Sequence, residues 1–178
     1  MGKEMTDKAS ATISVRLSAA DYAAFNIYHG RWQLAVLHVF YCALFALLLA
    51  NFGIMGQKLS PAAALALAVA LSGALLAFQL WRIRARTAKL FERDNLNGLE
   101  QRIRLDESGL HHSAGDTSSH VPWKDVVRAA ETRNAVILYI DRNKAILLPK
   151  RDIPDLANVL RLLQQHMPAA KLRLKSKT

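Results

Sequence analysis

Three histidines and an aspartate lie close together in the C-terminal half of the chain, and imidazole and carboxylate groups are common zinc ligands. They are His111, His112, Asp116 and His120. Neighbouring side chains of a β-strand point to opposite faces, so His111 and His112 cannot readily share one ion. The intervals also match no recognisable zinc pattern. We therefore interpret these residues as solvated strand and turn residues, and we predict neither a metal site nor a cofactor.

A second polar pair lies inside an apolar run. His38 and Cys42 are four residues apart, so they share one face of a helix. A polar side chain in a membrane helix is a sign of function, but one histidine could equally form a hydrogen bond to a neighbouring helix, and it has no partner for a proton relay. Cys42 is the single cysteine, which excludes a disulfide within the chain.

The remaining candidates for chemistry are carboxylates in the C-terminal region. Asp125, Glu131 and Asp141 could surround a cleft, but nothing in their spacing pairs them. No nucleophile motif, glycine-rich phosphate loop or Walker pattern is present. We predict that the protein is not an enzyme.

Basic residues near the end of this region form the most defensible binding patch. The candidate patch comprises Arg142, Lys144, Lys150 and Arg151. It could contact an acidic headgroup, a peptide or another protein partner. It could also be a solvated sheet edge that discourages aggregation, because charged residues on an edge strand oppose strand pairing between molecules.

These residues flank two long apolar runs, Leu34 to Ile54 and Pro61 to Leu80. A hydrocarbon core about 30 Å thick needs about 20 helical residues to cross, and both runs are that long. Lys58 is the single Lys, Arg, Asp or Glu between Trp32 and Trp81. We predict a transmembrane hairpin over residues 32–82, with helices over about 32–54 and 61–82.

Tryptophan and arginine lie at the outer ends of both predicted helices, where each favours the membrane interface. The interface residues are Arg31, Trp32, Trp81, Arg82, Arg84 and Arg86. The loop between the helices has only Lys58, whereas the outer ends have several arginines. Under the positive-inside rule, this difference in positive charge places both termini in the cytoplasm. The formal net charge of +10 is therefore assigned to topology and to attraction for anionic headgroups, rather than to nucleic acid.

Small residues recur on one side of the second apolar run. They are Ala62, Ala66, Ala70, Gly73, Ala74 and Ala77. Small side chains allow helix backbones to approach closely in lipid. The stripe could pack against the first helix or join two copies of the chain, and in the second case the protein could be a subunit of an oligomeric transport or channel assembly.

The polar flanks predict three further parts. Residues 1–31 form a cytosolic strand and a short helix that ends near Gly30, and residues 83–99 continue the second membrane helix as a stalk. Residues 100–178 contain closely spaced short strands, typical of an antiparallel β-meander. An amphipathic helix over residues 153–167 then closes the sheet, and a basic tail follows it. The predicted fold is an α+β membrane protein.

The segment from His120 to Ile153 resembles the YcxB-like family of small membrane proteins. The shared features are Gly109-Leu110, Trp123 followed by Asp125, Glu131, Tyr139 and the run Leu148-Pro149-Lys150-Arg151. The resemblance implies a bacterial inner-membrane protein whose domain over residues 100–178 is similar to bacterial pleckstrin-homology-like (PH-like) domains. It implies no biochemical activity. We expect an integral membrane protein that anchors a small interaction domain at the cytoplasmic face.

Overall fold

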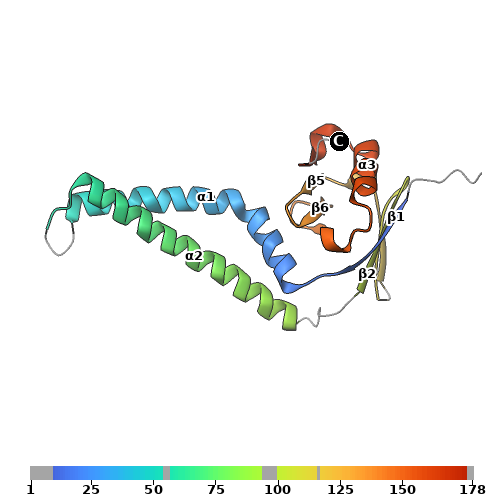
Figure 1. Cartoon of the computed structure of the whole chain (residues 1–178), viewed down its shortest axis with the longest axis horizontal. Helices are drawn as coiled ribbons and strands as arrows, with labels where there is room; N and C mark the ends of the chain where they lie inside the picture. Colours follow the sequence, from blue (N-terminus) through green and yellow to red (C-terminus); the bar gives the residue numbers. More distant parts are fainter. Residues whose placement is uncertain (1–9, 54–56, 94–99, 116, 176–178) are drawn as a thin grey trace, which may run out of the picture. The chain divides into compact units, whose positions relative to one another are not determined.

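The computed structural model describes residues 10–53, 57–93, 100–115 and 117–175. The chain divides into two compact units, one comprising Met1–Ser18 with Leu96–Thr178 and the other Ala19–Asn95. The predicted class, α+β with two long apolar helices and antiparallel sheet, is confirmed (Figure 1). The ends predicted for the first membrane helix and for the stalk, together with Asp116, lie outside the described residues.

The helical unit is a pair of long helices, α1 (Ala19–Phe52) and α2 (Pro61–Arg93). At about 1.5 Å per residue each is about 50 Å long, well beyond the 30 Å of a hydrocarbon core. The helix predicted to continue beyond Trp81 does so as far as Arg93, because α2 runs past Trp81 without a break. The prediction of a separate short helix ending near Gly30 is wrong. Gly30 lies inside α1, which bends in its first third (Figure 1), and glycine is one of the residues at which helices bend.

The face of α2 that packs against α1 differs from the predicted one. Ala64, Ala68 and Ser72 are buried and repeat every four residues. The predicted stripe lies on other faces of α2: Gly73 is half-buried, and the exposed members are Ala62, Ala66, Ala70, Ala74 and Ala77. Both sets have small side chains at a spacing of four, and that spacing alone does not distinguish one helix face from another. The stripe is therefore not the contact within the hairpin.

The first sheet contains β1 (Ala11–Arg16), β2 (Glu100–Asp106), β3 (Gly109–Ala114) and β4 (Thr117–Pro122), in that order and antiparallel. β1 pairs with β2 along its whole length, from Ala11↔Leu105 to Arg16↔Glu100. The predicted separation of residues 1–31 from the C-terminal domain is therefore wrong. Ile13 and Val15 are buried, since alternate residues of β1 face the core.

The second sheet has the order β7-β6-β5-β8. Its strands are β5 (Arg128–Glu131), β6 (Ala135–Tyr139), β7 (Ala145–Pro149) and β8 (Leu172–Arg173). The first three are antiparallel, whereas β8 pairs with β5 in parallel. The predicted meander is thus two sheets, and part of the basic tail is a strand.

One amphipathic helix, α3 (Leu156–His166), contributes buried side chains to the core of this unit. Asp155 caps its start by accepting a hydrogen bond from the backbone N–H of Asn158. Val159, Leu160 and Leu163 are buried, which confirms the predicted apolar face. Trp123, in the short 3-10 helix η1 (Trp123–Asp125), is also buried.

Candidate functional site

The predicted basic patch is divided between the two ends of the β6–β7 hairpin. Arg142 and Lys144 are exposed in the turn between the strands. Lys150 and Arg151 follow β7, in the 3-10 helix η2 (Lys150–Asp152), and the backbone N–H of Lys150 donates to the carbonyl of Asn134 at the other end of the hairpin. A hairpin turn and its open end are separated by the length of the strands. The four residues therefore do not form one patch.

The two residues after β7 have structural contacts. Lys150 Nζ forms an ion pair with Oε1 of Glu131, whose side chain is 2% exposed. The other oxygen of Glu131 accepts the backbone N–H of Lys175. Arg151 donates from Nη2 to the backbone carbonyl of Arg16, at the end of β1. These cations hold segments of the domain together.

The three predicted carboxylates do not converge on a cleft. Glu131 is at the end of β5 that pairs with the start of β6, at Val136. Asp125 is exposed in η1, before the other end of β5, and exposed Asp141 accepts the backbone N–H of Arg142 in the β6–β7 turn. Glu131 is thus at the opposite end of the sheet from the other two.

His111 and His120 are brought together by the register of β3 and β4. They are directly opposite residues, and their rings stack with centroids 4.4 Å apart. Ser108 Oγ lies 3.1 Å from Nε2 of His111 and 3.4 Å from Nε2 of His120. His112 is not part of this cluster, because its Nε2 lies 3.0 Å from Oε1 of Gln101; burial lowers the pKa of this imidazole. The sequence predicted that His111 and His112 would be apart, but it did not reveal the His111–His120 pair.

Asp106 completes this surface cluster. Its Oδ1 accepts hydrogen bonds from the Ser108 hydroxyl at 2.6 Å and the Ser108 backbone N–H at 2.9 Å. The hydroxyl bond is the main cause that lowers the pKa of Asp106 to about 2, with help from the Ser108 N–H and from the charges of His111 and Arg104. Within the described part of the chain, no three His, Cys, Asp or Glu side chains are placed to hold a metal ion.

On the hairpin, the predicted interface residues are largely exposed. Trp32 and Trp81 are 72% and 61% exposed. Arg31 stacks over the ring of Tyr28 and donates to its backbone carbonyl, whereas Arg82, Arg84 and Arg86 are exposed along α2. His38 Nδ1 is buried and has no hydrogen-bond partner among the described residues. It lines a cavity of about 10 Å³ beside Ser72 and Gln79.

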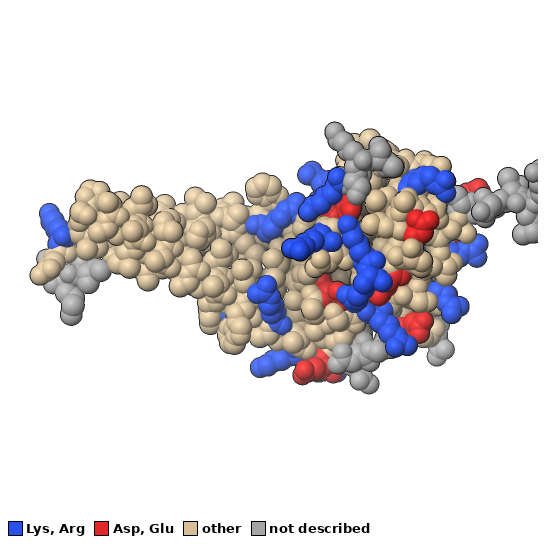
Figure 2. All heavy atoms as spheres, viewed as in Figure 1, with Lys and Arg blue, Asp and Glu red and all other residues tan. Residues whose placement is uncertain are grey.

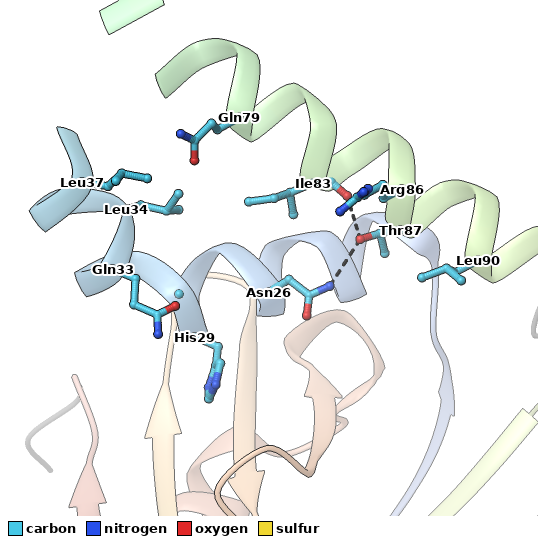
Figure 3. Close-up of a pocket in the computed structure, with 11 residues that line it drawn as sticks. Asn26, His29, Gln33, Leu34, Leu37, Gln79, Ile83, Arg86, Thr87 and Leu90 are labelled. Carbon is cyan, nitrogen blue, oxygen red and sulfur yellow. Dashed lines mark hydrogen bonds between the residues drawn. The ribbon is translucent and has the colours of Figure 1, made fainter. Parts of the chain in front are cut away.

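A larger pocket, of about 450 Å³, opens between α1 and α2 next to this small cavity. Its apolar lining comprises Leu34, Leu37, Ile83 and Leu90. Its polar lining comprises Asn26, His29, Gln33, Gln79, Arg86 and Thr87. Figure 3 shows Leu34 and Leu37 of α1 facing Gln79 and Ile83 of α2. This volume is within the range of about 300–1,000 Å³ typical of small-molecule sites.

Contacts between the helices lie on both sides of the pocket. On the side away from the loop, near the start of α1 and the end of α2, Asn26 Nδ2 donates to Thr87 Oγ1 at 3.3 Å (Figure 3). The rings of Tyr22 and Phe91, on the same side, have centroids 5.6 Å apart. Toward the loop, Ser72 is buried. Sequence reasoning missed this pocket, although two amides were visible at the outer ends of the apolar runs, Gln33 directly after Trp32 and Gln79 two residues before Trp81.

The fold defines an α+β protein in which a long apolar helical hairpin is inserted between two paired strands of a small β domain. Residues 105–165 match the model of a family described as YcxB-like protein. The matched segment runs from β2 into α3, and over it the resemblance predicted from the sequence is confirmed. The comparison with curated proteins found no match.

Proposed function

We propose that the protein is an integral membrane protein whose hairpin anchors a PH-like interaction domain at the cytoplasmic face of a bacterial inner membrane. Interaction, rather than catalysis, is its task. The observation that carries the proposal is the pairing of β1 with β2, which joins the chain before the hairpin to the chain after it.

The exposure of the two helices supports membrane insertion. Both are long and apolar enough to cross a membrane, yet 0% and 17% of their most apolar windows are buried. A core helix of a soluble protein would be mostly buried. Here the large apolar side chains of Val36, Phe40 and Leu47 are all more than half exposed. The visible surface of the hairpin is uncharged over most of its length (Figure 2).

The β1–β2 pairing supports a topology with both ends of the hairpin on one side. Six consecutive residue pairs form between these strands, so the strands cannot lie on opposite sides of a bilayer. A hairpin that crosses the membrane twice returns the chain to the side on which it started, whereas a single crossing would leave β1 and β2 on opposite sides. The arginines at the outer ends of both helices favour the cytoplasm as the shared side.

The arrangement of the β domain supports a PH-like fold. Four antiparallel strands are followed by three more, and an amphipathic helix comes next, which contributes four buried residues. The carboxylates of Asp125, Glu131 and Asp141 do not converge, and the cluster of Asp106, Ser108, His111 and His120 lies on the surface rather than in a cleft. A role in binding a protein partner or the membrane surface fits these features better than catalysis.

Topology reporters test the proposal. A reporter that is active only in the cytoplasm should work when fused after Thr178 and fail when inserted at Lys58 in the loop. Alkaline carbonate should leave the protein in the membrane fraction. Extraction by carbonate, or a reporter active at Lys58 and silent at Thr178, would overturn the proposal.

A second candidate is self-association of hairpins, as in an oligomeric transport or channel subunit. The exposure of Ala62, Ala66, Ala70 and Ala74 favours it, because this stripe is not used within the hairpin. It predicts an oligomer in mild detergent that Ala70→Leu disrupts. A monomer unaffected by this change would count against it.

A further inference from the structure

We propose that the pocket between α1 and α2 is a binding site for one anionic phospholipid, with the phosphate group at Arg86 and an acyl chain along Leu34 and Leu37. This inference rests on the proposed membrane insertion. It adds a specific lipid site to the anchor, separate from any interaction of the β domain.

Among the described lining residues, the charged one lies toward the outer end of the hairpin, whereas the leucines of α1 lie toward the loop, with the amides of Gln33 and Gln79 close to the tryptophan level. Leu34 and Leu37 lie on the bilayer side of the level marked by Trp32 and Trp81. Arg86 and Asn26 lie on the opposite side of that level, toward the ends of the hairpin. A phospholipid has the same order, with apolar chains in the bilayer and a charged phosphate at its surface. Basic pockets between membrane helices bind anionic headgroups in this way.

The charge of the lining selects an anionic headgroup. Arg86 forms no ion pair or hydrogen bond with other described residues, so its guanidinium is available to a phosphate. The lining residues that the structure describes include no Asp or Glu. A zwitterionic lipid would bring an ammonium group next to Arg86 without a carboxylate to pair with it. An anionic lipid that lacks the ammonium group avoids this repulsion between two positive charges.

The pocket is held open by contacts on both sides of it. The Asn26–Thr87 hydrogen bond and the Tyr22–Phe91 ring contact join the helices at one end, and the buried Ala64, Ala68 and Ser72 join them at the other. A site that exists before the ligand arrives loses less conformational entropy on binding. Gly30 also lines the pocket, and a Cβ added there would have no heavy atom within 4 Å among its neighbours. A larger side chain at Gly30 would therefore enter open space.

Native mass spectrometry of the full-length protein in mild detergent tests the site, with lipid counted per protomer. The probes are phosphatidylglycerol, phosphatidylcholine and inorganic phosphate, each added to delipidated protein. We expect one phosphatidylglycerol to be retained. Arg86→Gln should weaken its binding about fivefold, the loss expected for one cationic contact at a membrane surface, and Gly30→Leu should abolish it by filling the pocket.

Two matched variants serve as controls. Arg84→Gln removes the same charge from the same helix but outside the pocket, and Gly73→Leu adds the same side chain at a glycine with similar open space. Both should retain phosphatidylglycerol as the wild type does. Equal losses in Arg84→Gln and Arg86→Gln would overturn the proposal, as would equal retention of phosphatidylcholine or no change in Gly30→Leu.

Inorganic phosphate separates the headgroup from the whole lipid. If inorganic phosphate displaces phosphatidylglycerol at a concentration similar to that of the lipid, the site binds the phosphate group alone and the acyl chain contributes nothing. The lipid proposal is then wrong. Carbonate extraction of the same variants separates this inference from the anchor. A protein that stays in the membrane but retains no lipid refutes the lipid site and leaves the anchor intact.

Discussion

Lys150 Nζ donates to Oε1 of Glu131 across the β domain, and this ion pair links the residue after β7 to the end of β5. The Glu131 side chain is 2% exposed and the Lys150 side chain 25% exposed. Removing one partner of a buried ion pair leaves the other charge without compensation. Lys150 therefore stabilises the folded domain through its ion pair with Glu131.

Replacing Lys150 by methionine should destabilise the second sheet by about 2–3 kcal/mol. This is below the usual cost of breaking a buried pair, because the backbone N–H of Lys175 still donates to Glu131. Amide hydrogen exchange of β5 and β6 in the full-length protein measures the opening free energy. Lys144→Met, at an exposed turn residue, should change it little, and equal effects of the two substitutions would contradict the assignment.

Asp106 should make the stability of the domain depend on pH between about 4 and 2. Its folded-state pKa of about 2 is below the ordinary aspartate value of 3.8. Its contribution is therefore complete above about pH 4 and is lost as the pH falls toward 2. We expect Asp106→Asn to be less stable than the wild type at pH 5, by about 1–2 kcal/mol after allowance for partial exposure.

Thermal unfolding of the full-length protein, followed by circular dichroism from pH 5 to pH 2, measures this difference. The wild-type and Asp106→Asn curves should converge as the pH falls. Asp125→Asn, at an exposed carboxylate, provides the comparison. A gap between wild type and Asp106→Asn that stays constant down to pH 2 would show that the Ser108 hydrogen bonds do not act through the ionised carboxylate.

Ala68→Leu should disrupt the packing of α1 on α2, whereas Ala70→Leu should not. Ala68 is fully buried and Ala70 is exposed, so an added isobutyl group clashes only at the first position. Overpacking a close contact costs about 1–3 kcal/mol. A thiol-reactive fluorophore that labels Cys42, the single cysteine, can follow thermal opening of the hairpin in detergent. Equal melting of the two variants would indicate that α1 packs against another face of α2.

The β domain should fold without the hairpin only if β1 is retained. A chain that joins residues 10–17 to residues 100–175 through a short Asn-Gly turn preserves the pairing of Arg16 with Glu100. We expect this chain to be soluble and to show dispersed amide resonances. Residues 100–175 alone should not, because β2 would lose one of its two partner strands and become an edge strand, and Ile103 would lose neighbouring core residues. A folded fragment without β1 would refute this requirement.

Local patterns in the sequence were enough to predict the long helices, most strands and the apolar face of α3. A strand was predicted within residues 1–31, where β1 has Ile13 and Val15 buried, and the helix predicted over residues 153–167 contains the whole of α3. Such signals depend on near neighbours in the chain. The pairing of β1 with β2 joins residues more than 80 positions apart, and no local pattern encodes it.

The candidate sites were harder to predict, because they depend on register and on which helix face is buried. Arg142 and Lys150 are near in sequence, but the length of β7 separates them. His111 and His120 look unrelated in sequence, and the antiparallel register of β3 and β4 stacks their rings. Arg86 appeared only as one of several interface arginines, and its place in a pocket required both helices.

The strand order of the first sheet also determines when the sheet can form during synthesis of the chain. β1 leaves the ribosome early, but its partner follows only after residues 17–99 have been translated, which takes roughly 4–17 s at about 5–20 residues per second. Under the proposed topology, both helices are made and can be handed to the insertion machinery before the sheet can close. A nascent chain whose hairpin leaves its two ends on opposite sides of the membrane keeps an unpaired β1, and the completed sheet therefore reports that both ends lie on one side.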